Sequence, residues 1–113
     1  MQNHPDLDEA RATLDMLAAG DPNELAELIA IVRDSLASGA ASLAGAVEAE
    51  DRKQVHFHSH TLKGALRTAG MEHLAALVED IELGAARLAV PELRTRASEI
   101  RGRVAVVVDG LAP

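Results

Sequence analysis

The segment HFHSHTLKGALRTAG (residues 56–70) contains the residue types that phosphoryl-group chemistry uses. It holds three of the five histidines of the chain, and a lysine and a glycine follow His60 at three and four residues. A neutral imidazole nitrogen is a competent nucleophile near neutral pH. An adjacent ammonium stabilises phosphoryl oxygens through charge-assisted hydrogen bonds. The spacing of His60, Lys63 and Gly64 therefore predicts a histidine that accepts a phosphoryl group, with Lys63 stabilising that group.

A helical wheel, at about 100° per residue, separates the side chains of this segment into two faces. The predicted core face consists of Val55, Ser59, Leu62, Leu66 and Ala69. His60 falls on the solvent side. Phe57, the only aromatic residue of the chain, falls on this side as well, and an exposed aromatic side chain indicates a docking surface. Gly64 lies inside the helix, where a glycine costs stability, so its lack of a side chain indicates close approach of a partner to His60. The predicted partner-docking surface around His60 consists of His56, Phe57, Gly64 and Arg67.

The charge around His60 is predicted to be positive. The chain has a net charge of −7, but no acidic residue lies between Gln54 and Met71. Lys63 and Arg67 are therefore expected to form a local positive patch beside His60. If Lys63 serves only the phosphoryl group, its replacement by alanine impairs transfer with little change in melting temperature.

Capping residues and apolar spacing predict the helices that position this face. Asp6, Asp21 and Asp51 stand at N-cap positions with a glutamate or glutamine three residues later, which is a capping-box spacing. Gly70 is the expected stop of the helix that carries His60. The predicted helices cover about residues 7–19, 22–50, 52–69, 72–88 and 91–111.

These helices define the predicted fold class. We expect an all-α fold, an up-and-down antiparallel four-helix bundle with a short additional N-terminal helix, in a single domain over residues 1–113. The run VAVVV (residues 104–108) is the one place where a strand is conceivable, but the period of the whole segment favours helix. Gly39 and Gly45 in the second helix are interpreted as sites of close helix packing.

Composition argues against several classes of protein. The net charge disfavours nucleic acid and anionic membrane surfaces as partners. The absence of cysteine excludes disulfides and thiolate metal sites. No apolar run approaches the ~20 residues that span a bilayer, and no signal-peptide pattern begins the chain. We therefore expect a cytoplasmic protein, either free-standing or the cytoplasmic part of a larger membrane-bound sensor kinase. We expect a monomer, because the apolar stripes of the predicted helices can all be buried within one bundle.

The motif in SHTLKGALRTAG (residues 59–70) resembles the signature of histidine-containing phosphotransfer (HPt) domains, the carriers of bacterial multistep phosphorelays. That signature is a histidine, any residue, a leucine, the pair Lys-Gly, and a further glycine ten residues after the histidine. The matching residues are His60, Leu62, Lys63, Gly64 and Gly70. The resemblance extends more loosely over nearly the whole chain.

Three positions depart from the pattern of the family. Ala65 stands where a small hydroxyl residue is often found, Thr68 where asparagine is often found, and Val32 in place of a phenylalanine common in the second helix. These departures bear on packing and partner choice, and they leave the histidine and the lysine of the motif in place.

The resemblance implies a phosphocarrier without an ATP site of its own, and not an enzyme. His60 would accept a phosphoryl group from the aspartyl-phosphate of a receiver domain, such as that of a hybrid sensor kinase. It would then pass the group to the aspartate of a response regulator. Mg²⁺ is expected on the receiver domain, and the chain itself is expected to hold no cofactor. Phosphoryl transfer needs mainly positioning and charge neutralisation, which agrees with an imidazole beside a lysine.

Two other modules with a phosphorylated histidine are alternatives. The phosphotransfer module of a chemotaxis-type histidine kinase has a similar motif and takes its phosphoryl group from a kinase domain of the same polypeptide. The dimerisation helices of a sensor kinase typically carry glutamate after the histidine and proline four residues later. Thr61 follows His60 and the next proline is Pro91, which disfavours this second alternative.

A helical metal-binding protein and a plain scaffold are alternatives of a different class. His56 and His60 are four residues apart, a spacing that can chelate zinc or nickel, but no carboxylate lies near them in the sequence as a third ligand. His58 points about 160° away from His60 on the wheel, so the three histidines do not converge. A scaffold does not account for the histidine, lysine and glycine of the motif occurring together.

Overall fold

Five helices joined by short turns make up the computed structural model, which describes residues 4–112. In chain order they are α1 (Pro5–Ala18), α2 (Pro22–Glu48), α3 (Arg52–Thr68), α4 (Glu72–Gly84) and α5 (Val90–Gly110). No strand occurs among the described residues, and the VAVVV run lies within α5. The predicted all-helical class and the five predicted helices are confirmed.

Two of the predicted aspartate caps begin their helices. The Asp21 carboxylate accepts hydrogen bonds from the backbone N–H groups of Asn23 and Glu24, at 2.9 and 3.3 Å. The Asp51 carboxylate accepts one from the N–H of Gln54 at 3.2 Å. These bonds satisfy N–H groups that have no partner inside the helix, and they fix where α2 and α3 start.

The predicted cap at Asp6 is wrong. His4 is the N-cap residue of α1 and Pro5 follows in its first turn, so Asp6 lies inside the helix. Its carboxylate accepts two hydrogen bonds, both at 3.0 Å, from the Arg103 guanidinium of α5. A bidentate carboxylate–guanidinium pair is strong and geometrically specific. The tertiary partner therefore takes the carboxylate away from the local N–H groups and ties α1 to α5.

α4 ends at Gly84 and not near Leu88, where the apolar spacing placed its end. The N–H of Leu88 donates to the Gly84 carbonyl at 2.8 Å. The Leu88 side chain covers Gly84, so that a Cβ there would overlap Leu88 Cδ1. Leu88 therefore belongs to a turn that folds back over the helix end. Its position continues the apolar spacing of α4, which is why the sequence pattern predicts a longer helix.

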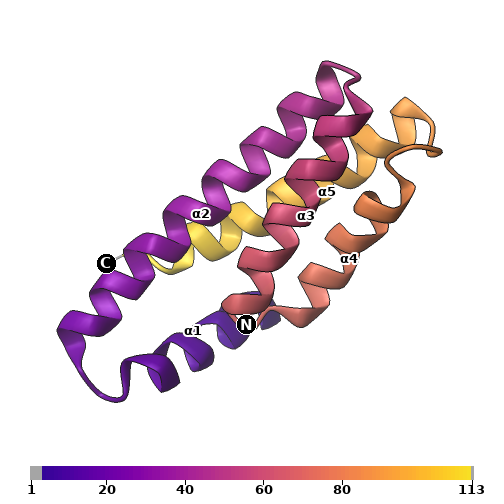
Figure 1. The fold of residues 1–113 in the computed structure, drawn as a ribbon. Helices are drawn as coiled ribbons and strands as arrows, with labels where there is room; N and C mark the ends of the chain where they lie inside the picture. The colour runs from indigo at the N-terminus through magenta and orange to yellow at the C-terminus, as the bar shows by residue number, and fades with distance from the viewer. Residues whose placement is uncertain (1–3, 113) are drawn as a thin grey trace.

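The helices pack around one apolar core. α3 packs on α2 and α4, α5 packs on the same two helices, and α1 packs on α2 and α5 (Figure 1). Gly39 of α2 lies against Leu62 of α3, where a Cβ would be 3.0 Å from Leu62 Cδ1, so the predicted close packing is confirmed there. Gly45 is exposed with open space around it, so the same interpretation is wrong for Gly45. The largest fully buried side chains include Leu14, Leu36, Leu43, Leu62, Leu66, Met71, Leu74 and Ile81.

Gly70 turns the chain from α3 into α4. Its φ of +82° lies in the left-handed region that favours glycine. A Cβ on Gly70 would also overlap the Thr13 side chain of α1. The predicted helix stop is confirmed, and the glycine permits both the turn and the close approach of α1.

α2 meets the length and composition of a membrane-spanning helix, alone among the helices within residues 4–112. The prediction from the sequence, that no apolar run approaches the length of a membrane span, is therefore not borne out by α2. The most apolar window of α2 has a mean hydropathy of 1.2, and 17% of that window is buried. A helix that packs inside a soluble bundle meets the same criterion, so one such helix is weak evidence for a membrane span.

Candidate functional site

His60 lies on the exposed face of α3 that the helical wheel predicts. The core side of α3 is buried, including Ser59, whose hydroxyl donates to the Val55 carbonyl at 2.6 Å. The His60 side chain is 67% exposed, and Phe57 is 58% exposed. Gly64 is exposed as well, and a Cβ there would have no neighbour within 4 Å. The predicted exposure of this face is therefore confirmed.

Gly64 leaves the space over His60 open. A side chain in a helix leans toward the N-terminus and covers the turn that precedes its own Cα. A side chain at position 64 would therefore lie over the His60 imidazole. The glycine leaves this side of the ring uncovered, at a stability cost of about 1 kcal/mol relative to alanine.

One buried carboxylate from α4 contacts the predicted site. The Glu82 side chain is 8% exposed. Its Oε2 lies 2.7 Å from His60 Nδ1, and its Oε1 lies 2.5 Å from Lys63 Nζ. His56 Nε2 is 4.0 Å from the same Oε2. Glu82 thus brings His60, Lys63 and His56 together, and it is absent from the site residues predicted from the sequence.

The sequence nevertheless contains a signal for Glu82. Leu74 and Val78 belong to the apolar stripe of α4, and Glu82 follows them at eight and four residues, on the same side of the helix. A glutamate in a core-facing position is almost never buried without a partner. The spacing therefore indicates a cation or an imidazole on a neighbouring helix, but it does not say which one.

The ionised state of Glu82 fixes the proton on His60. Burial alone raises the pKa of Glu82, but the hydrogen bonds and positive charge of Lys63 and His60 outweigh burial and hold the pKa below its ordinary value of 4.5. An ionised carboxylate only accepts hydrogen bonds, so His60 Nδ1 carries the proton. The lone pair of the neutral ring is then on Nε2, on the side of the ring away from that bond.

The lowered pKa of Glu82 predicts how stability depends on pH. A carboxyl group whose pKa falls on folding stabilises the folded state above its unfolded pKa, and the contribution is lost as the pH falls through the folded value. The stability advantage of the parent over Glu82→Gln is therefore expected to be largest above the ordinary carboxyl value of 4.5 and to shrink as the pH falls below that value. Urea unfolding at a series of pH values measures this difference, and a constant difference from acid to neutral pH contradicts it.

The predicted positive patch is wrong, because carboxylates of α4 neutralise it. Lys63 is paired with Glu82, and its side chain is 15% exposed. Arg67 is paired with Glu79 at 2.8 Å and lies 3.5 Å from Glu72. α3 itself contains no acidic residue, but the acidic partners of Lys63 and Arg67 come from α4, which packs beside it.

The three histidines do not converge, as the wheel predicts. His56 and His60 face Glu82, whereas His58 is half-buried and its ring meets Phe57 edge-on, with 5.1 Å between the ring centroids. Glu82 supplies a carboxylate near these two histidines, although none lies near them in the sequence. Even so, no group of three histidine, cysteine, aspartate or glutamate side chains that could hold a metal ion occurs within residues 4–112.

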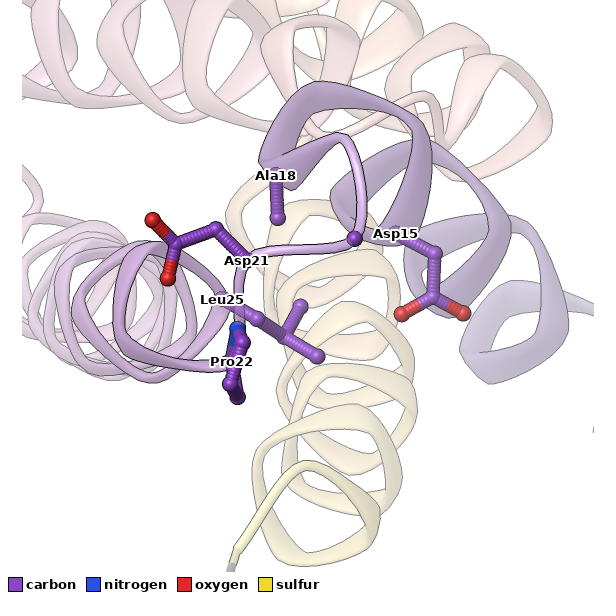
Figure 2. A pocket seen from close by; sticks show the side chains of 6 residues that line it. Asp15, Ala18, Asp21, Pro22 and Leu25 are labelled. Carbon is purple, nitrogen blue, oxygen red and sulfur yellow. The ribbon is translucent and has the colours of Figure 1, made fainter.

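The site is an exposed helix face and not a pocket. A hollow of about 320 Å³ lies between the end of α1 and the start of α2 (Figure 2). None of its lining residues belongs to the His60 site. Small-molecule sites are usually concave, whereas His60 stands on an open helix face with its side chain 67% exposed. The lining residues of the hollow are Asp15, Ala18, Gly20, Asp21, Pro22 and Leu25.

An all-helical chain that displays an accessible imidazole beside a lysine and a glycine has the architecture of a phosphotransfer module. The family model of the Hpt domain matches residues 24–109, a range that includes the whole site, and the chain belongs to the Hpt domain family. Members of this family are phosphocarriers that act in histidine phosphotransfer in phosphorelay signalling and interact with receiver domains. Comparisons with curated proteins and with solved structures gave no match.

Proposed function

We propose that His60 accepts a phosphoryl group on Nε2 from the aspartyl-phosphate of a receiver domain and passes it to the aspartate of a response regulator. The exposed imidazole, whose Nδ1 lies 2.7 Å from the buried Glu82 carboxylate, carries this proposal. The bond directs the lone pair of the neutral ring to Nε2, where a protein partner can reach it.

The proposed transfer moves one phosphoryl group between two side chains. The Nε2 lone pair forms a bond to phosphorus, and the bond between phosphorus and the aspartyl oxygen breaks, with its electron pair remaining on the carboxylate. The ring gains positive charge as the new bond forms, and the Glu82 carboxylate on Nδ1–H stabilises that charge. Delivery to a response regulator reverses these changes. In this proposal Mg²⁺ belongs to the receiver domain, and the chain supplies neither a cofactor nor an ATP site.

The docking surface around His60 is proposed to consist of His56, Phe57, Gly64 and Arg67. Phe57 offers apolar surface that a partner can bury, and Gly64 lets the partner approach the ring. Arg67, already paired with Glu79, contributes a polar rim and not a free positive charge.

The proposed scaffold is an up-and-down antiparallel four-helix bundle of α2 to α5, with α1 as an additional helix, in one domain over residues 1–113. Each of these four helices packs on two of the others, which supports a closed ring of four. We propose a cytoplasmic monomer, free-standing or part of a sensor kinase, in which this domain contacts neither membrane nor nucleic acid.

Incubation with a panel of phosphorylated receiver domains tests this function. Mass spectrometry at neutral or basic pH locates the phosphate, because phosphohistidine survives there. We expect transfer to His60 from at least one receiver domain and none from ATP alone. A parallel arm with ATP and histidine-kinase catalytic domains tests the chemotaxis-type alternative. If His60 is labelled in that arm alone, the donor is a kinase domain and not a receiver domain.

Lys63→Gln is expected to slow phosphoryl transfer more than it lowers stability. The ammonium of Lys63 is proposed to stabilise the phosphoryl oxygens, and glutamine removes its charge while keeping an N–H donor for Glu82. The transfer rate from a phosphorylated receiver should fall about tenfold or more, as quench-flow labelling measures. The lifetime of the phosphohistidine should shorten in parallel.

Lys63→Ala provides the comparison and revises the expectation from the sequence alone. This variant also removes the hydrogen bond to the buried Glu82 carboxylate, so the free energy of unfolding should fall by about 1–3 kcal/mol. A Lys63→Gln protein with the transfer rate and phosphohistidine lifetime of the parent would leave Lys63 with a structural role alone.

A further inference from the structure

Arg52 joins the start of α3 to the end of α4. Its Nη1 donates to the Ala85 carbonyl at 2.9 Å and to the Leu88 carbonyl at 2.7 Å, and both contacts are partly buried. Ala85 is the C-cap residue of α4, and Glu82 stands in the last turn before it. The guanidinium therefore holds the turn of α4 that carries the carboxylate of the His60 site.

The position of Arg52 at the N-terminus of α3 does not favour a cation through the helix dipole, and the nearby Asp51 carboxylate is already used as the N-cap. Arg52 is the first residue of α3, and no acidic residue lies in that first turn. A helix N-terminus carries a partial positive charge, which repels a cation. α4 has no basic residue in its last turn, where a cation is favourable. Arg52 thus supplies, from α3, the cation that the end of α4 lacks.

The backbone hydrogen bond that Glu82 itself accepts at the end of α4 is long, although the turn that follows closes onto the Gly84 carbonyl through the Leu88 N–H at 2.8 Å. The Ala85 N–H donates to the Glu82 carbonyl at 3.4 Å, which is long for this type of bond. The His60–Glu82 distance is 2.7 Å, and a separation of about 3.6 Å no longer makes a hydrogen bond. A shift of about 1 Å in this last turn is therefore enough to separate the carboxylate from the ring.

We propose that Arg52 is a positioning residue that acts on His60 through Glu82. By anchoring the C-terminal end of α4, Arg52 keeps the Glu82 carboxylate on Nδ1 and thereby keeps the lone pair on Nε2. The importance of this for phosphoryl transfer rests on the proposed function. The position of the proton on the ring is a property of the unphosphorylated protein and is measured without any donor.

Arg33 provides a matched control. Its Nε donates to the Val108 carbonyl in the last turns of α5, at 3.0 Å, and this contact is also partly buried. Arg33→Ala therefore removes the same kind of anchor from the end of a helix that does not carry Glu82. Any effect that comes from lost stability alone should appear in both variants.

The experiment compares the histidine rings of the parent, Arg52→Ala, Arg33→Ala and Glu82→Ala by long-range proton–nitrogen NMR, which reports the protonated ring nitrogen. In the parent and in Arg33→Ala, neutral His60 should carry its proton on Nδ1. In Arg52→Ala the proton should shift toward Nε2, in the direction of the Glu82→Ala reference. Transfer from a receiver domain should fall about tenfold in Arg52→Ala and less than about twofold in Arg33→Ala.

Arg52→Lys keeps a cationic donor and should restore the pattern of the parent in part. If Arg52→Ala does not fold, the proton position on His60 is compared between Arg52→Lys and the parent instead. An unchanged proton position in the Arg52 variants overturns the positioning role, and so does an equal change in Arg33→Ala. If no receiver domain labels the parent while the NMR shift occurs as expected, the proposed function fails and the positioning of the ring by Arg52 stands.

Discussion

Replacement of His60 by glutamine is expected to abolish phosphoryl acceptance from every receiver domain and to leave the fold intact. The side chain is 67% exposed, so the core loses almost no packing. Glutamine keeps an amide donor for the Glu82 carboxylate, but its amide nitrogen is not a nucleophile. Labelling should fall to background by mass spectrometry, while the free energy of unfolding changes by less than about 1 kcal/mol.

His58→Gln is the matched control for this loss. His58 is half-buried and contacts Phe57 instead of Glu82, so its replacement should leave labelling of His60 in place. Phosphate found on His56 or His58 of the parent would place the acceptor elsewhere. Labelling that survives in His60→Gln would do the same.

The exposed face of α3 could be predicted from the sequence because periodicity is a property of a single helix. The spacing of Leu62 and Leu66 identifies the buried side, and His60 and Gly64 then fall on the other side without knowledge of any neighbour. Asp51 and Gly70 mark the ends of this helix by equally local chemistry. The exposure of His60 and Gly64 and both ends of the helix are therefore predicted correctly.

Contacts between helices could not be predicted in the same way. Glu82 lies 22 residues from His60, and its position beside Nδ1 of the ring depends on the register of α4 against α3, which neither helix pattern contains. The false cap at Asp6 has the same origin, because its partner Arg103 lies 97 residues away. Lys63 was therefore predicted as a free cation, whereas the structure pairs it with a buried carboxylate.

Gly64→Gln is expected to separate docking from folding. A Cβ at position 64 has no neighbour within 4 Å, and replacing a glycine inside a helix gains up to about 1 kcal/mol. The same side chain leans over His60 and fills the space that a receiver domain must enter. Stability should therefore equal or exceed that of the parent, while transfer from a receiver domain falls about a hundredfold. Thermal melting and quench-flow labelling measure the two quantities.

Gly102→Gln is the matched control, since Gly102 in α5 is also exposed with open space around it but lies on another helix. It should gain similar stability and transfer at the rate of the parent.

Gly64→Ala should be as stable as Gly64→Gln and should lose less of the transfer rate. Gly64→Gln should hinder labelling by a small donor such as phosphoramidate less than labelling by a receiver domain. An unfolded Gly64→Gln protein would make position 64 a packing position. Transfer at the rate of the parent would place the docking surface elsewhere and leave the glycine beside His60 without a role in access.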